Sequence, residues 1–184
     1  MHTYISMLRG INVSGQKRIT MVELKKVYEV LDLLNVETYV QSGNVVFNTT
    51  EQDMAKLSIL IEKQIEETYG YFVPTLIRNV NDFQRIINNN PFINKRNEDP
   101  TKLYVTFLYR TPTASRLSAL VIPNNEAAEF VLGEKEIYIF CPNGYGRTKL
   151  SNTFFEKKLD MLATTRNWNT VNALLRLTNE RKTL

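Results

Sequence analysis

The sequence predicts an α+β protein made of two ferredoxin-like (βαββ-type) halves, with antiparallel sheets, helices and a C-terminal helical segment. Each half runs in the order strand, helix, strand, strand, helix. A polar, proline-punctuated stretch over residues 91–101 reads as a linker between them. The 184 residues are 43% hydrophobic and 23% charged, which is typical of globular chains rather than disordered ones. We therefore predict a first half over residues 1–90 and a second over 102–184.

Capping and turn signals position the elements of the first half. Thr20 and Glu23 have the spacing of a capping box, and the apolar residues that follow recur at three- and four-residue intervals. Gly43 and Asn44 tolerate positive φ and predict a hairpin. Strands are expected at 4–9, 37–41, 45–47 and 73–78, and helices at 20–34, 53–69 and 80–87.

The second half opens with residues 103–109, a run of β-branched and aromatic residues typical of a strand. No comparably clear closing strand follows its second helix, so this half is expected to end in helices instead. Strands are expected at 103–109, 127–132 and 136–141, and helices at 113–120, 152–159 and 170–181.

Several strands of the second half are apolar on both faces. Tyr104, Tyr138 and Phe140, displayed on an open sheet, would resemble the base-stacking platform of an RNA-recognition module. The alternative is that the two halves pack sheet against sheet and bury these rings. We favour burial, because aromatic strand residues usually belong to cores.

Composition excludes several kinds of chemistry. Cys141 is the only cysteine and His2 the only histidine, so no intramolecular disulfide and no ordinary zinc site can form. A Ser/His/Asp or Cys/His triad would depend on the histidine next to the first methionine. No apolar stretch approaches the roughly 20 residues that cross a bilayer, and no secretion signal is evident. We expect a cytoplasmic protein without metal, cofactor or membrane contact.

The net charge of +4 is concentrated at one end of the chain. From Gly144 onward, eight Lys and Arg residues stand against three Asp and Glu, whereas the remaining chain has a balance of −1. Such a field attracts phosphate-bearing partners, including nucleic acid. The alternative is an ordinary solvated surface around two C-terminal helices.

Four polar segments, at residues 9–12, 41–44, 144–149 and 165–170, combine amide or guanidinium side chains with turn-forming backbone. Arg and Asn side chains suit the binding of a polar or anionic ligand. Lys17 with Arg18, and Arg147 with Lys149, also precede predicted helix N-termini, where anions bind readily. The candidate ligand-binding residues are Arg9, Asn12, Lys17, Gln41, Ser42, Asn44, Arg147, Thr148, Lys149, Arg166, Asn167, Trp168 and Asn169.

Each segment also has a purely structural interpretation. Gly43 and Asn44 could simply turn a hairpin, and Asn167 or Asn169 could cap the last helix. Trp168 could be a hydrophobic anchor for that helix. The segment at 144–149 lacks the spacing of a Walker loop.

Longer stretches around these segments resemble a bacterial domain-of-unknown-function family (sixteen-ninety-seven). The stretches are RGINV (9–13), TYVQSGNVVF (38–47), GYGRTKL (144–150) and TTRNWNTV (164–171). The chain departs from the family where Ser14 replaces a common glycine and Thr148 a common serine. The resemblance implies a compact α+β protein with ferredoxin-like halves and a shared polar patch, and it implies no reaction.

Three functional hypotheses follow. The first is a binding module for an anionic ligand, a nucleotide or nucleic acid, in a polar cleft between the halves. The second is a small-molecule enzyme that works without histidine, with Lys149 and Tyr145 as the nearest acid/base groups. The third is a structural interaction protein whose polar segments only hold the halves together.

Overall fold

The computed structural model describes residues 1–180, and these form two compact units. Unit 1 comprises residues 1–84 together with residues 174–180, and unit 2 comprises residues 85–173. The stretch at 91–101, expected from the sequence as a linker, contains helix α4 (Pro91–Asn94) and the start of a 3-10 turn, η1 (Pro100–Lys102).

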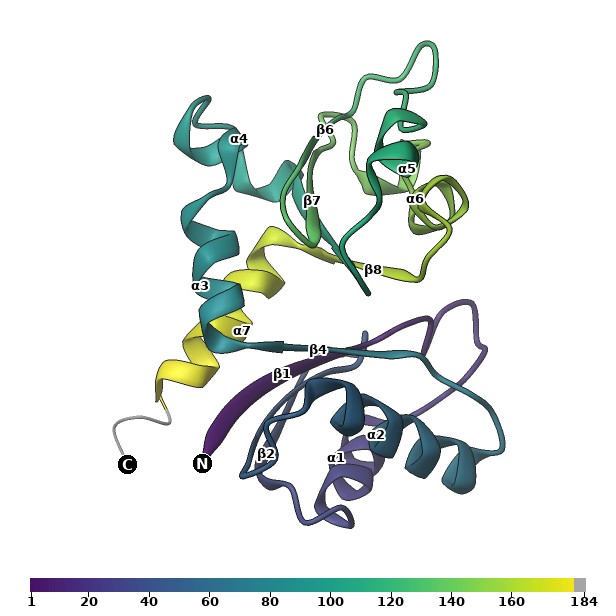
Figure 1. Ribbon diagram of the computed structural model, residues 1–184, viewed down its shortest axis with the longest axis vertical. Coiled ribbons are helices and arrows are strands. Elements are labelled where there is room, and N and C mark those ends of the chain that lie inside the picture. The colour runs from purple at the N-terminus through teal and green to yellow at the C-terminus, as the bar shows by residue number, and fades with distance from the viewer. Residues whose placement is uncertain (181–184) are drawn as a thin grey trace. The chain divides into compact units, whose positions relative to one another are not determined.

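Unit 1 has the complete split βαββαβ topology. Its sheet has the order β2-β3-β1-β4, and every neighbouring pair is antiparallel. Both helices cover the same face of this sheet (Figure 1). The elements are β1 (His2–Leu8), α1 (Met21–Glu29), β2 (Leu34–Tyr39), β3 (Asn44–Thr49), α2 (Met54–Tyr69) and β4 (Thr75–Asn79).

The two helices of unit 1 begin and end where their capping residues dictate. Thr20 and Glu23 form the predicted capping box at the start of α1. Asp53 caps α2, and Gly70 ends it in the left-handed conformation. Helix α1 is shorter than predicted because the chain leaves the helical conformation at Asp32 (φ 56°), after which residue 34 already belongs to β2.

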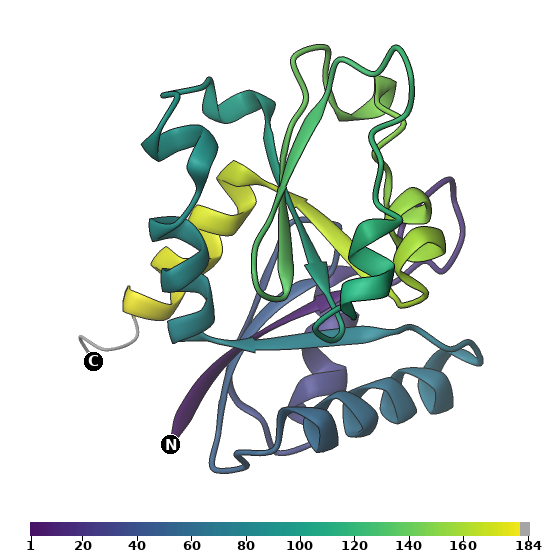
Figure 2. The ribbon, with the colours of Figure 1, turned by 45° about the horizontal axis from the view of Figure 1, so that its top comes forward.

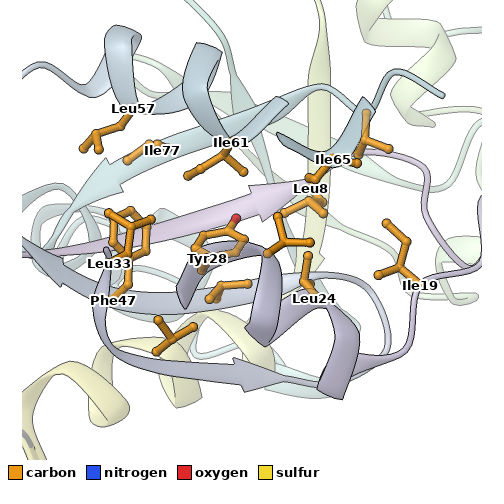
Figure 3. Close-up of a cluster of buried hydrophobic side chains, with 14 of the residues drawn as sticks. Leu8, Ile19, Leu24, Tyr28, Leu33, Phe47, Leu57, Ile61, Ile65 and Ile77 are labelled. Carbon is orange, nitrogen blue, oxygen red and sulfur yellow. The ribbon is translucent and has the colours of Figure 1, made fainter. Parts of the chain in front are cut away.

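The core of unit 1 lies between these helices and the sheet. Leu24 and Tyr28 of α1 and Ile61 and Ile65 of α2 point toward strand residues such as Phe47 (Figure 3). Tyr28 is fully buried, and its hydroxyl shares a 2.7 Å hydrogen bond with Ser6 on β1. The polar end of this ring is therefore satisfied inside the core.

Unit 2 repeats the same topology, with sheet order β6-β7-β5-β8 and antiparallel pairs throughout. The expectation that this half lacks a closing strand was wrong, because β8 pairs with β5 over its whole length. Helices α5 and α6 lie beside one another in two views of the molecule (Figures 1 and 2). The elements are β5 (Leu103–Leu108), α5 (Ala114–Ser118), β6 (Glu129–Leu132), β7 (Glu136–Phe140), η2 (Tyr145–Arg147), α6 (Asn152–Leu159) and β8 (Ala163–Asn167).

The aromatic residues of this sheet do not share one face. Tyr104 pairs with Ile139 in the register, so it faces away from Tyr138 and Phe140. Its ring packs 4.8 Å from the ring of Tyr145. On the opposite face, the Tyr138 hydroxyl donates to the Ile86 carbonyl (3.1 Å), and the Phe140 ring lies 5.9 Å from that of Phe92. All three aromatic residues contact other residues of unit 2. They do not form one stacking platform.

The two closing strands lead directly into helices in the same way. Helix α3 (Val80–Asn88) follows β4, and α7 (Trp168–Glu180) follows β8. Residues 78–81 and 166–169 have the common pattern Arg-Asn-apolar-Asn. Position 181, where the last helix was expected to end, lies outside the described residues. None of the helices within residues 1–180 is long and apolar enough to cross a membrane.

Candidate functional site

The four polar segments form two pairs in the structure, one pair in each unit. The segments at 9–12 and 41–44 lie at the same end of the sheet of unit 1, because β1 ends there and β3 begins there. The segments at 144–149 and 165–170 meet in unit 2. One cleft common to all four stays a prediction.

The two segments of unit 1 are joined through backbone and amide contacts. The Leu8 N–H donates to the Gly43 carbonyl (2.8 Å). The Asn12 side chain donates to the Gln41 carbonyl (2.8 Å) and the Ile19 carbonyl (2.9 Å), and it accepts from the Ile19 N–H (3.0 Å). Asn12 therefore fixes the shape of this loop, and its side-chain NH₂ group makes both of its hydrogen bonds within the protein.

A third segment, residues 70–72, reaches the same end of unit 1. The Tyr71 hydroxyl donates to the Arg18 carbonyl (3.0 Å), and the Lys17 ammonium donates to the Phe72 carbonyl (2.7 Å). We refer to residues 9–18, 40–43 and 70–72 as the loop cluster. Its members are held by contacts between segments far apart in sequence, which preorganises them.

Gly43 is required by the close approach within the loop cluster. Its φ is +74°, and a Cβ placed there would lie 2.6 Å from Ile11 Cδ1 and 2.9 Å from Leu8 Cβ. The neighbouring Asn44 is fully buried and donates to the Tyr39 carbonyl (2.9 Å) and to the Ser42 hydroxyl (3.0 Å). These contacts agree with the hairpin interpretation of Gly43 and Asn44.

An open depression of about 380 Å³ lies in the loop cluster beside the start of α1. Among the described residues, the exposed side chains of Arg18 and Gln41 have no hydrogen-bond or ion-pair partner there. They therefore present one cation and one amide to solvent. The residues that line the depression are Asn12, Gly15, Arg18, Ile19, Thr20, Glu23 and Gln41.

Glu23 adds an acid to this depression. Its Oε2 accepts from the Thr20 N–H (3.1 Å) and the Thr20 hydroxyl (2.7 Å), and these hydrogen bonds lower the pKa of the carboxyl group. The Thr20 hydroxyl oxygen accepts in turn from the Glu23 N–H (3.2 Å). The Glu23 carboxylate thus already lies at the N-terminal turn of α1, and the binding of a further anion there by Lys17 and Arg18 stays a prediction. Of those two cations, Arg18 alone faces the depression without a partner.

In unit 2, a tyrosine joins the two polar segments. The Tyr145 hydroxyl donates to the Thr165 hydroxyl oxygen (3.2 Å), and the Thr165 hydroxyl donates to Asn152 Oδ1 (2.6 Å). A depression of about 120 Å³ lies near them, lined by Cys141, Arg147, Thr148 and Lys149, among others. It is much smaller than the depression of unit 1.

The cations of this second depression are partly neutralised. The Lys149 ammonium donates to the Asn124 carbonyl (3.1 Å), and the Lys149 backbone N–H donates to the Glu126 carboxylate (2.6 Å). Burial would raise the pKa of Glu126, but hydrogen bonds from Lys149, Ala128 and Thr148 outweigh it and lower the pKa. Arg147 is exposed. An anion at this place would meet the Glu126 charge.

The last segment mainly serves the fold. Arg166 is 6% exposed, and its guanidinium donates to the Thr164 hydroxyl (2.8 Å) and the Thr165 carbonyl (2.9 Å). Asn167 Oδ1 accepts from the Thr170 N–H (2.8 Å) at the start of α7, as the capping interpretation expects. Trp168 is 6% exposed, which agrees with an anchoring role. Asn169 is exposed.

Tyr145, one of the two residues considered for acid/base chemistry, is poorly suited to it. Burial raises the pKa of the Tyr145 hydroxyl despite its hydrogen bond to Thr165. Burial also raises the pKa of the Cys141 thiol to about 12, with a further contribution from the Glu126 charge. Within residues 1–180, no group of three or more His, Cys, Asp and Glu side chains could hold a metal ion.

Sequence reasoning missed two features that the structure shows. Glu23 was recognised only as a capping residue, although a capping-box acid necessarily lies beside the loop that precedes its helix. The repeated Arg-Asn-apolar-Asn pattern was also overlooked. In each copy the asparagine after the arginine caps the next helix, since Asn79 Oδ1 accepts from the Asp82 N–H (2.8 Å), as Asn167 does from Thr170. Comparing the two copies would have revealed β8.

Comparison with known proteins agrees with the fold and identifies the family. The chain is similar in structure to a conserved bacterial protein from Streptococcus pneumoniae, with a TM-score of 0.73 and 22% sequence identity over 95% of this chain and 97% of that one. No curated protein matches it. A family described as "Protein of unknown function (DUF1697)" matches residues 1–138, a range that includes the first two resemblance stretches and ends before the other two. The chain therefore belongs to the DUF1697 family.

Proposed function

We propose that the protein binds a phosphate-bearing ligand at the loop cluster of unit 1, with Arg18 as the principal cation. The observation that carries the proposal is the exposed Arg18 guanidinium, which has no partner within residues 1–180 and lines a depression beside Gln41. A guanidinium presents a rigid fork of N–H donors that matches the oxygens of a phosphate.

The surroundings of Arg18 support this function. The depression of about 380 Å³ has the volume of a small-molecule site, which is ~300–1,000 Å³. Its walls are already fixed by the Asn12, Lys17 and Tyr71 hydrogen bonds, so little ordering entropy remains to be lost when a ligand binds. Gln41 offers both a donor and an acceptor to the same ligand.

Calorimetric titration with inorganic pyrophosphate and with ADP at low ionic strength tests the proposal. Arg18→Gln should weaken both interactions by about tenfold or more, because a hydrogen bond to a charged group is worth ~1.5–3 kcal/mol. Lys63→Gln is the matched control, since Lys63 is an exposed cation of α2 paired with Glu67, and it should bind like the wild type. Failure of the wild type to bind either probe, or equal affinity of the Arg18 variant, would refute the proposal.

A second candidate, nucleic-acid binding, is favoured by a group of cations on unit 2. Arg110 donates to the Asp160 carbonyl (2.9 Å), and Arg116 pairs with the Asp160 carboxylate (2.9 Å). Lys157 and Lys158 lie in the last turn of α6, which Asp160 follows, and both are exposed. Residues 85–180 hold thirteen Lys and Arg against nine Asp and Glu, a balance of +4.

Gel-shift titration of single-stranded RNA and duplex DNA over a range of salt concentrations tests this candidate. The double change of Lys157 and Lys158 to Gln should weaken binding on all sequences alike. It should also reduce the salt slope by about 1.4–1.8, if each lysine neutralises one phosphate. The same change at Lys25 and Lys63 is the control. An unchanged slope in the Lys157/Lys158 variant would exclude this surface.

The proposal places the protein in the cytoplasm. Its single cysteine, Cys141, is buried and has no second cysteine to pair with, so the fold requires no oxidising compartment. Fractionation of the native cells, with detection by antibody, tests this location.

A further inference from the structure

Glu23 is an unexpected component of an anion site. One of its oxygens, Oε2, accepts hydrogen bonds from Thr20, whereas Oε1 makes no hydrogen bond to any residue of the described chain. The residue is exposed and lines the same depression as Arg18 and Gln41. The lowered pKa of Glu23 keeps it ionised at neutral pH. A bare anion bound by Arg18 would therefore be repelled by this carboxylate.

We propose that the ligand of the loop cluster is a ribonucleoside phosphate, which offers its phosphate to Arg18 and a sugar hydroxyl to Glu23 Oε1. This inference rests on the proposed function. A carboxylate accepts hydrogen bonds but cannot donate them, so it selects ligands that carry hydroxyl or amine donors. Carboxylates bind ribose hydroxyls in this way in dinucleotide-binding folds. The Glu23 carboxylate, which would repel a bare anion, would thus bind the sugar of a nucleotide.

The charge of this part of the chain favours a small nucleotide over a polymer. Residues 1–84 hold eight Lys and Arg against ten Asp and Glu, a balance of −2. A nucleic acid gains most of its affinity from many phosphate–cation contacts, which this half does not provide in excess. A mononucleotide needs one cation and a few directed hydrogen bonds. Arg18, Gln41 and Glu23 supply such a set in one depression.

The variant Glu23→Gln tests the role of the carboxylate without removing the cap. A capping box accepts Gln in place of Glu, so α1 should form normally, and a circular dichroism melt verifies this. The affinity for pyrophosphate should rise by severalfold, because a repulsive charge is removed. The affinity for ADP and UDP should fall by about fivefold, because a charge-assisted hydrogen bond is roughly twice as strong as a neutral one.

Two controls isolate the sugar contact. The 2′,3′-dideoxy form of ADP has no sugar hydroxyl for Glu23, so the wild type should bind it less tightly than it binds ADP. The Glu23→Gln variant should bind this dideoxy form at least as tightly as the wild type does. The variant Glu29→Gln removes an equal charge elsewhere on α1, where Glu29 pairs with Lys25, and should change neither probe.

The outcomes separate the two proposals. If ADP and pyrophosphate both bind more tightly to Glu23→Gln, the carboxylate only repels anions. The inference is then wrong, while binding at Arg18 stands. Equal affinity of the wild type for ADP and its dideoxy form would overturn the inference in the same way. If pyrophosphate and ADP fail to bind the wild type at all, the proposed function itself is wrong.

Discussion

At the scale of single residues, unit 2 contains a buried charge, the Glu136 carboxylate, which is 1% exposed. Arg85 holds it with a bidentate contact of 2.6 and 3.0 Å, and the Lys135 N–H donates to it at 3.1 Å. Burial would raise the pKa of Glu136, but these contacts outweigh burial and place the pKa below its ordinary value of 4.5. The stability that Glu136 contributes is therefore complete above that value and is lost as the pH falls through the folded-state pKa.

We predict that Arg85→Met reduces the free energy of unfolding by about 3 kcal/mol at pH 7, because it leaves a buried charge without its partner. Burial then raises the pKa of Glu136, so protonation relieves the penalty and the loss should shrink toward pH 4. Urea denaturation at both pH values measures this. Lys63→Met, which breaks an exposed pair on α2, should cost less than ~0.5 kcal/mol. A loss that does not depend on pH would contradict the assignment to Glu136.

Gly43 and Gly10 separate two effects that glycine has in the loop cluster. Both have φ of +74°, but a Cβ at Gly10 would meet nothing within 4 Å, whereas one at Gly43 would clash with Ile11 and Leu8. Gly10→Ala should cost about 1–2 kcal/mol from backbone strain alone. Gly43→Ala should cost a further ~1–3 kcal/mol from overpacking. Equal melting temperatures for the two variants would show that the close approach at Gly43 has no energetic weight.

At the scale of elements, α1 depends on the Thr20 cap, and α5 provides a natural control. Thr113 occupies the same N-cap position in α5 but makes no capping hydrogen bond. Thr20→Ala should therefore lower the free energy of unfolding by about 1 kcal/mol, and Thr113→Ala should leave it nearly unchanged. Chemical denaturation of both variants tests the difference. Similar losses would mean that the threonines act through something other than capping.

The elements that the sequence predicted well are those with large apolar residues or explicit caps. Strand β4 contains Leu76 and Ile77 and was predicted, whereas β8 has the sequence ATTRN and was not. Strand β8 is nevertheless largely buried, because its alanine and threonine side chains fill the space next to β5. The Arg166 guanidinium donates hydrogen bonds to oxygen atoms of neighbouring residues. Hydrophobic periodicity cannot detect such a strand. The strand can be detected from the Arg-Asn pattern that it shares with β4.

At the scale of the whole molecule, the sequence predicted which segments are polar and turn-forming but could not predict which side chains remain available. Asn12 and Lys17 were expected to bind a ligand, yet both are hydrogen-bonded to carbonyl groups of other segments. Those partners lie far away in sequence. Arg18 was considered only together with Lys17, and Glu23 became a candidate site residue only when the depression was known. Charge and residue type are local properties, whereas availability depends on the folded chain.

The single cysteine offers a reporter for unit 2. Cys141 is 1% exposed, and burial raises the pKa of its thiol to about 12, so almost no thiolate exists at pH 8. A thiol-specific reagent should leave the native protein unlabelled at pH 8 and label it fully in denaturant, as measured by intact mass. Rapid labelling of the native protein would contradict this burial.

Two helices, rather than loops, carry the chain across the division between the units. The division falls within α3, between residues 84 and 85, and within α7, between residues 173 and 174. Unit 1 is thus assembled from residues 1–84 and residues 174–180, which flank unit 2 in the sequence. A ribosome cannot finish unit 1 until it has translated the whole of unit 2, and a gene cut after codon 90 would encode a unit 1 that lacks residues 174–180.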